Sequence, residues 1–481
     1  MIFLSLARLI TIILSIISIT MVIPVGVALY YGEFHVISGF AIPGIICIFF
    51  AILFFFITRK KNFHLSSRAG FGAVALSWIF ASLLGAMPFF ITGYSPSFAD
   101  AFFESASGFT TTGATIFSDV ESLPRSINLW RSQMHWLGGM GIVALTVALL
   151  PLLGVGGFQL IKAETTGPEK GKITPKITVT AKILWFIYLG FTILQTVLLL
   201  FAGMDFVDAL SHSFATLGTG GFSTRNASIS SYNSALIDWI CTIFMFLSGV
   251  NFSLYYHLIV RHGSEIKDNT ELKAYIIIFL IASLGITVCV IPQYGSFVNA
   301  LRHGAFQVAS IMTTTGFYTA DYTQWPQFAQ IIIFALMLIG GCSGSTAGGV
   351  KVIRWVILGK QMGNEMRRMI HPHGIFSIQI NKRVGRKDIV YNVAAFMFLY
   401  SVLVLITTLV ASLNNIDLLS SLTASLALVG NIGPGFGAVG PVQNFGFFND
   451  VSKYWFSFVM IAGRLELYTM LIFFMPSFWK K

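Results

Sequence analysis

The chain of 481 residues is 55% hydrophobic and only 10% charged, and its mean hydropathy is +0.79. This composition excludes an ordinary soluble domain, in which about a quarter of the residues are charged. The net charge of +11 at pH 7 calls for an explanation, either in a polyanionic partner or in the topology of a membrane protein. We expect an integral membrane protein.

Apolar stretches of about 20 residues, long enough to cross a bilayer as a helix, recur along the chain. They are predicted near residues 5–30, 36–57, 70–92, 129–153, 181–203, 235–260, 273–292, 327–358, 389–412 and 453–475. The first resembles a signal peptide in having Arg8 ahead of an apolar run. That run is too long for a signal sequence and lacks a small-residue cleavage site, which favours a retained span.

Four shorter apolar stretches, of 11 to 15 residues, lie between these spans at 98–109, 206–216, 298–312 and 417–429. They are too short to cross a bilayer and are predicted to be re-entrant helices. Each is followed by one copy of a motif, which reads Phe-Thr-Thr-Thr-Gly at 109–113, Leu-Gly-Thr-Gly-Gly at 217–221, Met-Thr-Thr-Thr-Gly at 312–316 and Gly-Asn-Ile-Gly-Pro-Gly at 430–435.

The spacing of the four copies predicts the fold. We align Gly113, Gly220, Gly316 and Gly433, while Gly435 competes for the fourth place across Pro434. The intervals are too long for a solenoid and suit a helix–pore loop–helix unit used four times around one axis. The expected fold is all-α, with four pseudo-symmetric repeats around a central ion pore and an extra N-terminal helix pair. The predicted units are 1–60 for the pair and 68–160, 179–262, 270–370 and 388–478 for the repeats.

Glycine-containing loops at membrane depth point to cation binding. Successive carbonyl oxygens can replace the water shell of a cation when the backbone adopts dihedrals that glycine reaches without steric cost. A single copy could instead be a helix end capped by glycine, but four copies in one arrangement argue against that. The predicted potassium-binding residues are Thr111, Thr112, Gly113, Gly218, Thr219, Gly220, Thr314, Thr315, Gly316, Asn431, Ile432 and Gly433.

A second glycine cluster interrupts the span at 327–358. Five glycines occur in ten residues, and each costs about 1 kcal/mol relative to alanine inside a helix. We predict an intramembrane loop below the filter, although a small-residue packing face is an alternative. The predicted gate comprises Gly340, Gly341, Cys342, Ser343, Gly344, Ser345, Thr346, Ala347, Gly348, Gly349 and Arg464.

Arg464 is included because it lies deep in the last span. An arginine there costs about 2.5–3.5 kcal/mol on insertion, so it should face the pore or a partner. Glu466, two residues on, would point elsewhere on a helix and is a poor partner. The alternative to a gating role is a structural arginine that bonds to carbonyl groups of the loop.

The distribution of charge predicts the orientation. With the N-terminus inside, the segments predicted to be cytoplasmic hold 24 of the 30 Lys and Arg residues but only 7 of the 19 acids. The basic character is therefore attributed to topology, and no nucleic-acid partner is expected. Four isolated cysteines give no metal or disulfide pattern.

These loops, together with Gly340–Gly349 and Gly463-Arg-Leu-Glu-Leu467, resemble the TrkH/KtrB/HKT superfamily of potassium transporters. The N-terminal pair makes the chain most similar to the bacterial TrkH branch. The resemblance implies a multi-pass protein of the bacterial inner membrane that conducts potassium and rubidium as a homodimer. Some plant relatives that favour sodium carry serine where Gly113 stands, which argues for potassium here. In the family, an arginine at the place of Arg464 impedes ions and contacts the loop.

The resemblance also implies a partner, a cytoplasmic TrkA-type ring of nucleotide-binding regulatory domains. This chain has no Walker or Rossmann motif, so any nucleotide is expected on that partner. The basic segments 162–182 and 359–388 are available for docking, or they simply reflect topology. Apart from these partners, we expect only membrane lipid around the chain.

Two other classes of protein agree less well with the sequence. An intramembrane enzyme would need a catalytic cluster, and neither HExxH nor paired membrane aspartates occur, so no enzyme is expected. His135, His212, His257 and His303 are dispersed and are interpreted as interfacial or core residues. A non-conducting anchor would not explain four loops. Passive conduction and proton- or sodium-coupled symport both stay open.

Overall fold

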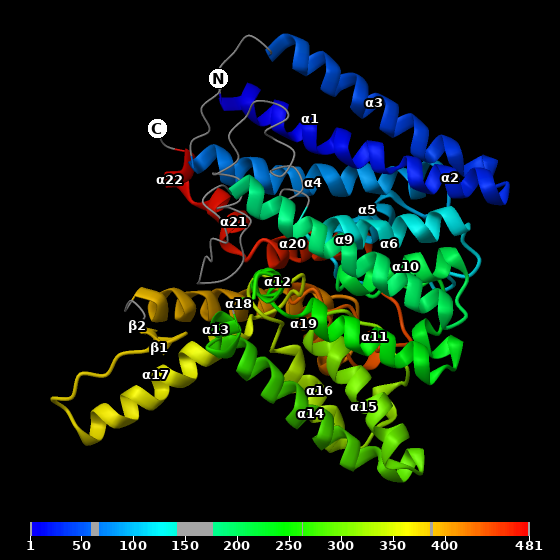
Figure 1. The fold of residues 1–481 in the computed structure, drawn as a ribbon. Helices are drawn as coiled ribbons and strands as arrows, with labels where there is room; N and C mark the ends of the chain where they lie inside the picture. The colour runs from blue at the N-terminus through cyan, green and yellow to red at the C-terminus, as the bar shows by residue number, and fades with distance from the viewer. Residues whose placement is uncertain (1, 59–66, 142–176, 262, 385–387, 480–481) are drawn as a thin grey trace.

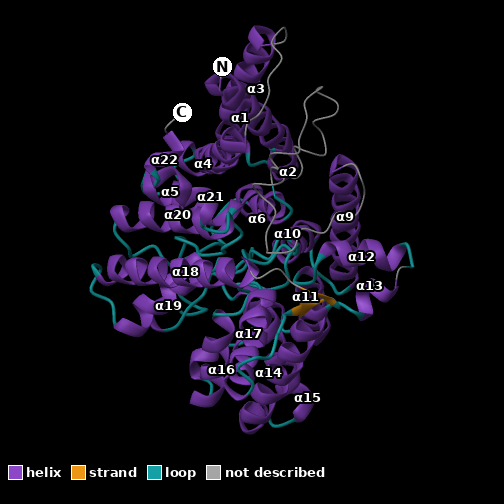
Figure 2. Ribbon diagram, turned by 90° about the vertical axis from the view of Figure 1, so that its left-hand side faces the viewer, coloured by secondary structure: helices purple, strands orange, loops and turns teal. Residues whose placement is uncertain are grey.

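The computed structural model describes residues 2–58, 67–141, 177–261, 263–384 and 388–479. Apart from one short hairpin, the regular structure in these ranges is helical, and Figure 1 and Figure 2 show the helices gathered around a centre of converging loops. The expectation of an all-α membrane fold is confirmed.

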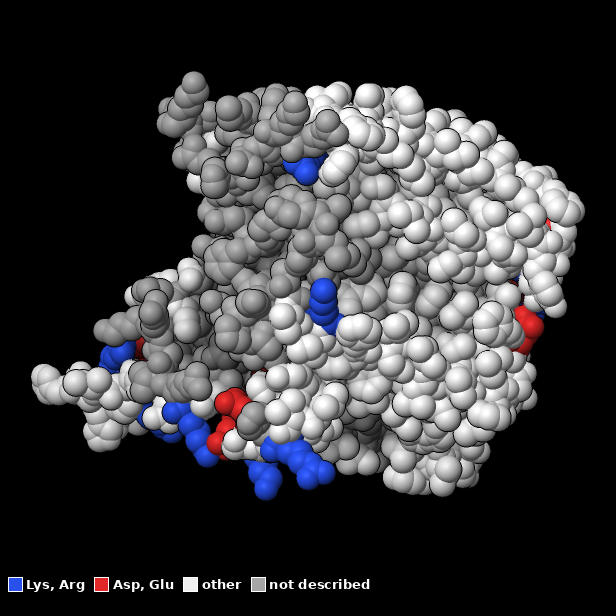
Figure 3. All heavy atoms as spheres, turned by 45° about the horizontal axis from the view of Figure 1, so that its top comes forward, with Lys and Arg blue, Asp and Glu red and all other residues white. Residues whose placement is uncertain are grey.

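Helices that can cross a membrane account for much of the described chain. Six segments are long and apolar enough, and these are Leu6–Tyr31, Phe34–Thr58, Gly70–Ile91, Val179–Phe201, Thr270–Tyr294 and Ile389–Ser412. Two bent helix pairs raise the number to eight if each counts as one span. Large apolar side chains on these helices, including Phe49, Phe186, Val288 and Leu405, are exposed. Figure 3 shows a broad surface almost free of charge, with most of the visible Lys and Arg gathered at one end. The chain is a multi-pass membrane protein.

The N-terminal part consists of three helices. They are α1 (Ile2–Thr20), α2 (Val22–Tyr31) and α3 (Phe34–Thr58), of which α1 and α2 follow one another as a single span. Helix α1 packs against α3 and against α4 of the first repeat, so the pair flanks the repeats (Figure 1).

Four repeats follow, each with a long first helix, a short helix, a loop and a second helix. The first helices are α4 (Ser67–Ile91), α9 (Ile177–Phe201), α14 (Thr270–Tyr294) and α18 (Asp388–Ser412). The short helices are α5 (Phe98–Phe109), α10 (Phe206–Leu217), α15 (Phe297–Met312) and α19 (Leu418–Val429). The second helices are α6 (Arg125–Gly139), α11 (Ala235–Ser248), α16 (Gln327–Met337) and α20 (Asp450–Arg464).

Local sequence explains where three of the four short helices begin. The side chains of Ser97, Ser296 and Asp417 accept hydrogen bonds from amides in the first turns of α5, α15 and α19. Such N-caps satisfy donors that a helix leaves unpaired, which matters most where water is scarce.

Contacts between repeats arrange them around an axis. Helix α6 of the first repeat packs on α10 of the second, and α11 of the second packs on α15 of the third. Helix α20 of the fourth repeat packs on α5 of the first. The last repeat thus returns to the first.

All four second helices stop at a similar point, whereas the sequence predicted such a break only in the third repeat. Continuous helices over 235–260 and 453–475 are wrong, because α11 and α12 (Phe252–Ile259) are bent by 93° and α20 and the segment Tyr468–Phe474 by 117°. The break expected in 327–358 is present, since α16 ends at Met337 and α17 (Val352–Ile370) begins after the glycine cluster. The part of the predicted span 129–153 beyond residue 141, and the boundary at 160, lie outside the described residues.

The remaining elements lie at chain turns and near the C-terminus. They are α13 (Gly263–Lys267), α21 (Tyr468–Leu471), α22 (Pro476–Trp479) and four short 3-10 turns, Ser228–Tyr232, Tyr322–Gln324, Gly437–Val439 and Ile472–Phe474. Strands β1 (Gln379–Ile380) and β2 (Arg383–Val384) form the antiparallel hairpin, with Gln379 opposite Val384. The hairpin was not predicted. It contacts the start of α14, where Asn381 and Thr270 exchange hydrogen bonds of 2.9 and 3.1 Å.

Candidate functional site

The four motifs adopt one backbone conformation. In each, the amide three residues past the short helix donates to a carbonyl five residues back, at 2.8 to 2.9 Å, and the donors are Thr112, Gly220, Thr315 and Ile432. This bond is that of a Schellman turn, whose preceding residue is left-handed. The left-handed residues are Thr111, Thr219, Thr314 and Asn431, with φ of 55°, 55°, 57° and 53°. A β-branched residue rarely adopts such a φ, so the surrounding structure imposes it.

A glycine with positive φ follows two residues later. These glycines are Gly113, Gly221, Gly316 and Gly433, with φ of 79°, 78°, 86° and 98°. The alignment through Gly220 is therefore wrong by one residue, and the segment predicted from Gly218 to Gly220 begins one position early. Gly220 occupies the place of Thr112 and Thr315. In the fourth loop the positive φ falls on Gly433 and not on Gly435.

The glycines close the loops into a ring. A Cβ on any of the four would meet the carbonyl oxygen of the next loop, and the pairs are Gly113 with Gly220, Gly221 with Thr315, Gly316 with Ile432, and Gly433 with Thr112. The order runs through repeats one to four and returns to one. Carbonyl oxygens of four equivalent residues thus form a closed ring, each set against the glycine of a neighbouring loop. This arrangement can take up a cation stripped of its water.

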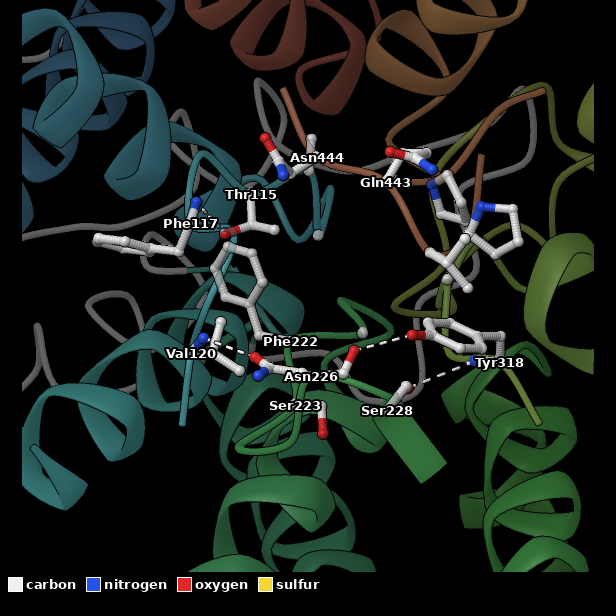
Figure 4. A pocket seen from close by; sticks show the side chains of 18 of the residues that line it. Thr115, Phe117, Val120, Phe222, Ser223, Asn226, Ser228, Tyr318, Gln443 and Asn444 are labelled. Carbon is white, nitrogen blue, oxygen red and sulfur yellow. Dashed lines mark hydrogen bonds between the residues drawn. The ribbon is translucent and has the colours of Figure 1, made fainter. Parts of the chain in front are cut away.

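A cavity of about 110 Å³ opens on the side of the residues that follow the glycines. All four glycines border it, and Figure 4 shows its walls formed by loops from every repeat. Asn226 joins three of these loops, because its Oδ1 accepts from the Val120 amide at 2.7 Å and its carbonyl accepts from the Tyr318 hydroxyl at 2.8 Å (Figure 4). We call this cavity the vestibule.

Asn226 also binds the carboxylate of Asp119, which lies near the vestibule, and changes its pKa. A hydrogen bond of 2.8 Å from the Asn226 side chain lowers the pKa of the Asp119 carboxyl group below its ordinary value. The group therefore stays charged to a lower pH than an ordinary aspartate, and its neighbours Ser118 and Val120 line the cavity. A negative charge there raises the local concentration of cations.

The segment Gly340–Val350, which we call the gate segment, lies on the opposite side of the ring. Its Gly348 amide donates to Thr314 Oγ1 at 2.7 Å, and a Cβ on Gly348 would lie 2.6 Å from the Gly430 carbonyl oxygen. These contacts are to residues that precede the ring glycines, whereas the vestibule is bordered by residues that follow them. The predicted gate residues from 340 to 349 form a folded loop directly against the third and fourth motifs.

Arg464 connects the gate segment to two helix ends. Its guanidinium donates to the Thr346 carbonyl at 2.7 Å and to the carbonyls of Gly138 and Gly139 at 2.8 and 2.9 Å. Arg464 is the last residue of α20, and it brings the end of that helix together with the end of α6 and with the gate segment. Glu466 pairs with Arg354, although the sequence prediction placed it on a continuous helix. The helix has already ended, and Glu466 has a φ of 55°.

Sequence reasoning missed Glu271, which joins the gate segment to the start of α17. Its Oε1 accepts from the Ser343 amide at 2.7 Å and from the Ile353 amide at 3.1 Å. The carboxylate is buried in the first turn of α14. An acidic residue at the start of an apolar span was the available signal, since such a residue is retained only where it has partners.

Another missed group is the ion pair between Glu104 and Arg131, which is fully buried behind the first motif with Arg131 Nε 2.8 Å from Glu104 Oε1. Glu104 accepts from the Ile116 amide, and Arg131 donates to the Ser223 carbonyl. The pair therefore ties the first loop to the second. Among the described residues, no group of three His, Cys, Asp or Glu side chains is placed to hold a metal ion.

Comparison with known proteins gives matches along the whole chain. Residues 36–481 match the family TrkH, described as cation transport protein. The "Trk system potassium uptake protein TrkH" of Escherichia coli strain K12 is 38% identical over 487 residues, with 100% of each chain covered. The "Trk system potassium uptake protein TrkG" of that strain is 36% identical, with 96% of each covered. The crystal structure of the potassium transporter TrkH from Vibrio parahaemolyticus superposes with a TM-score of 0.88 at 36% identity, covering 100% of both chains.

Proposed function

Because the chain belongs to the TrkH family of cation transport proteins, we propose that it is the membrane-embedded pore subunit of a potassium uptake system. The observation that carries the proposal is the closed ring of four carbonyl oxygens, each set against a glycine of the next loop. The relatives named as potassium uptake proteins cover the full chain and support potassium as the ion.

In this proposal potassium, or rubidium, enters the vestibule and binds at the ring. The carbonyls of Thr112, Gly220, Thr315 and Ile432 replace part of its water shell. The left-handed residues each precede a residue that supplies a ring carbonyl, so they lie after the ring on the path of an ion that enters from the vestibule. Thr111 Oγ1 is buried and has no hydrogen-bond partner in the described part of the chain, so this oxygen is available to an ion. Four loops of unequal sequence form the site, and we expect discrimination against sodium to be moderate.

The gate segment and Arg464 close the path beyond the ring. A guanidinium in a low-dielectric passage repels cations, and the folded segment blocks the passage sterically. Conduction then requires that the gate segment leaves its contacts with Thr314, Gly430 and Arg464. The arrangement in which these contacts are made is therefore the closed one.

We assign control of the gate to a cytoplasmic partner. The proposed assembly is a homodimer in the bacterial inner membrane, with the N-terminus cytoplasmic and a TrkA-type ring that carries the nucleotide. The end of α17 and the hairpin offer a docking surface within 359–388. Most of the other candidate segment, 162–182, lies outside the described residues.

Rubidium uptake into proteoliposomes that contain the purified chain tests the proposal. Uptake should be saturable, should be competed by potassium more strongly than by sodium, and should be absent from empty liposomes. No uptake by folded protein, with or without its regulatory partner, would remove the assignment. A reversal potential measured under a proton gradient then separates passive conduction from coupled transport, because only coupling shifts it.

A further inference from the structure

The second motif lacks the side chains that brace the first and third. In the first loop the hydroxyls of Thr110 and Thr112 lie 2.8 Å apart, and in the third those of Thr313 and Thr315 lie 2.7 Å apart. These pairs hold the backbone next to the ring carbonyl. The second loop has glycine at both equivalent positions, 218 and 220. Its ring carbonyl must be held by something else.

Helix α6 of the first repeat occupies the space that these glycines leave. A Cβ on Gly220 would overlap the imidazole ring of His135, and one on Gly218 would meet the His135 carbonyl group. A Cβ on Gly139 would in turn lie 2.6 Å from the Gly218 Cα. The helix and the loop therefore pack backbone against backbone, and the glycines of the second motif are explained by this contact.

The hydrogen bonds of His135 fix its ring in one orientation. Nδ1 lies 2.8 Å from the Gly108 carbonyl oxygen, which can only accept, so Nδ1 carries the proton. Nε2 then accepts from the Phe222 amide at 3.2 Å. The imidazole is fully buried and bridges the end of the first short helix to the second loop, immediately after Gly221.

Arg131 adds a second point of attachment on the same face of α6, four residues earlier. It donates to the Ser223 carbonyl at 3.2 Å, and its guanidinium lies 4.2 Å from the centre of the Phe222 ring. The His135 ring is also 4.2 Å from that centre. Two consecutive residues of the second loop are thus held by two side chains of α6.

We propose that His135 is a positioning residue that aims the Gly220 carbonyl at the ion and thereby sets the discrimination between potassium and sodium. The inference rests on the proposed conduction of potassium. Paired threonine hydroxyls hold the backbone within the first and third loops. In the second loop, the imidazole of His135, which belongs to the first repeat, takes over this role. His135 was interpreted from sequence as an interfacial or core residue, and this assignment gives it a specific task.

The test compares ion selectivity among purified, folded variants in proteoliposomes with potassium and sodium on opposite sides. In His135→Ala we expect the permeability ratio of potassium to sodium to fall about tenfold, because a site needs its ligands held to within about 0.5 Å. Gly220→Thr should lower the ratio as well, since the added side chain meets the ring. The double variant should regain part of the loss, because the threonine fills the space that the imidazole leaves.

Gln133→Ala is the matched control. Gln133 is equally buried on α6, but its amide donates to the Thr20 carbonyl of α1, away from the loops. The permeability ratio of potassium to sodium in Gln133→Ala should match that of the unaltered protein. If His135→Ala does not fold, His135→Gln takes its place; it keeps a donor and an acceptor without the ring and should lower the ratio less.

An unchanged ratio in every folded His135 variant overturns the inference, as does an equal fall in Gln133→Ala. The inference is also overturned if the double variant has a permeability ratio no higher than that of the worse single variant. A purely structural histidine would lower the thermal stability and leave the ratio alone. Absence of rubidium uptake by the unaltered protein is a separate outcome, and it would count against the proposed function itself.

Discussion

Each ring glycine meets two requirements, and only one is local. The first is a positive φ, which glycine adopts without strain. The second is space, because the position of a Cβ is taken by the carbonyl oxygen of the neighbouring loop. Sequence reveals the first requirement through a motif, but the second exists only between repeats. For this reason Gly220 and Gly221 could not be told apart in the sequence.

Gly113→Ser tests the second requirement. The added side chain displaces the Gly220 carbonyl, so discrimination between potassium and sodium should fall severalfold while sodium permeation persists. Relative permeability of the two ions in proteoliposomes measures this. Gly93→Ser is the control, because Gly93 has a similar φ of 76° with nothing within 4 Å of its Cβ position. Equal permeability ratios in the two variants would place Gly113 outside the filter.

The sequence locates elements well where their limits are set locally. The short helices begin and end within one residue of the predicted limits, because serine or aspartate caps precede most of them and a Schellman turn ends each. The breaks at Gly249 and after Arg464 were missed because each lies within a stretch that is apolar enough over about 20 residues to be predicted as one span. The cause of the first break is tertiary, since the Gly249 carbonyl accepts from the Cys342 amide of the gate segment at 2.8 Å. A continuous helix would leave no carbonyl for that bond.

The gate segment should open when its restraints are removed. Arg464→Ala deletes a positive charge from the passage, and a shortened gate segment removes the steric block. Each should raise the basal rubidium flux without the regulatory ring, with little loss of selectivity because the ring of carbonyls is untouched. The flux is normalised to folded protein, since Arg464 also joins α20 to α6. Flux that is lower or unaltered in both variants would show that this constriction is not the gate.

Glu271→Leu should loosen the gate segment where the carboxylate ties it to the start of α17. The change leaves the Ser343 and Ile353 amides without their acceptor, at a cost of about 1–3 kcal/mol for each buried donor. We expect a higher basal flux and faster hydrogen exchange across the gate segment. Glu265→Leu, at an exposed site on α13, is the control. Unchanged exchange at the gate segment would mean that the carboxylate does not restrain it.

At the scale of the whole molecule, pseudo-symmetry persists in the backbone while the side chains have diverged. Threonine pairs brace two loops, and α6 contacts the second. In the fourth, the Asn431 amide donates to Thr112 Oγ1 and to the Met460 carbonyl. The number of repeats could be read from the motifs, whereas these individual supports depend on which neighbour each loop meets.

Ring closure between the last and first repeats is reinforced by a buried ion pair. Lys453 of α20 lies 2.6 Å from Asp100 of α5. Lys453→Met should destabilise the protein by about 3–5 kcal/mol, because it leaves a buried carboxylate unpaired. Thermal unfolding in detergent measures this, and adding Asp100→Asn should restore much of the loss. A double variant as unstable as the single one would contradict the argument.

Arg368→Met supplies the comparison for that measurement. Arg368 pairs with Glu365 at 2.8 Å, but both side chains are about half exposed. Such a surface pair contributes about 0–1 kcal/mol. A loss as large as that of Lys453→Met would mean that burial does not explain the difference.

The contact between Gly433 and the Thr112 carbonyl also bears on how the protein is made. The hydrogen bond beside it, from Asn431 to Thr112, joins residues 319 positions apart. A ribosome therefore delivers the first wall of the site long before the fourth. During synthesis the nascent chain holds one, two and then three walls in the membrane, and no closed ring of oxygens forms until the final repeat has been inserted. Insertion of the fourth motif is thus a condition for the site to exist.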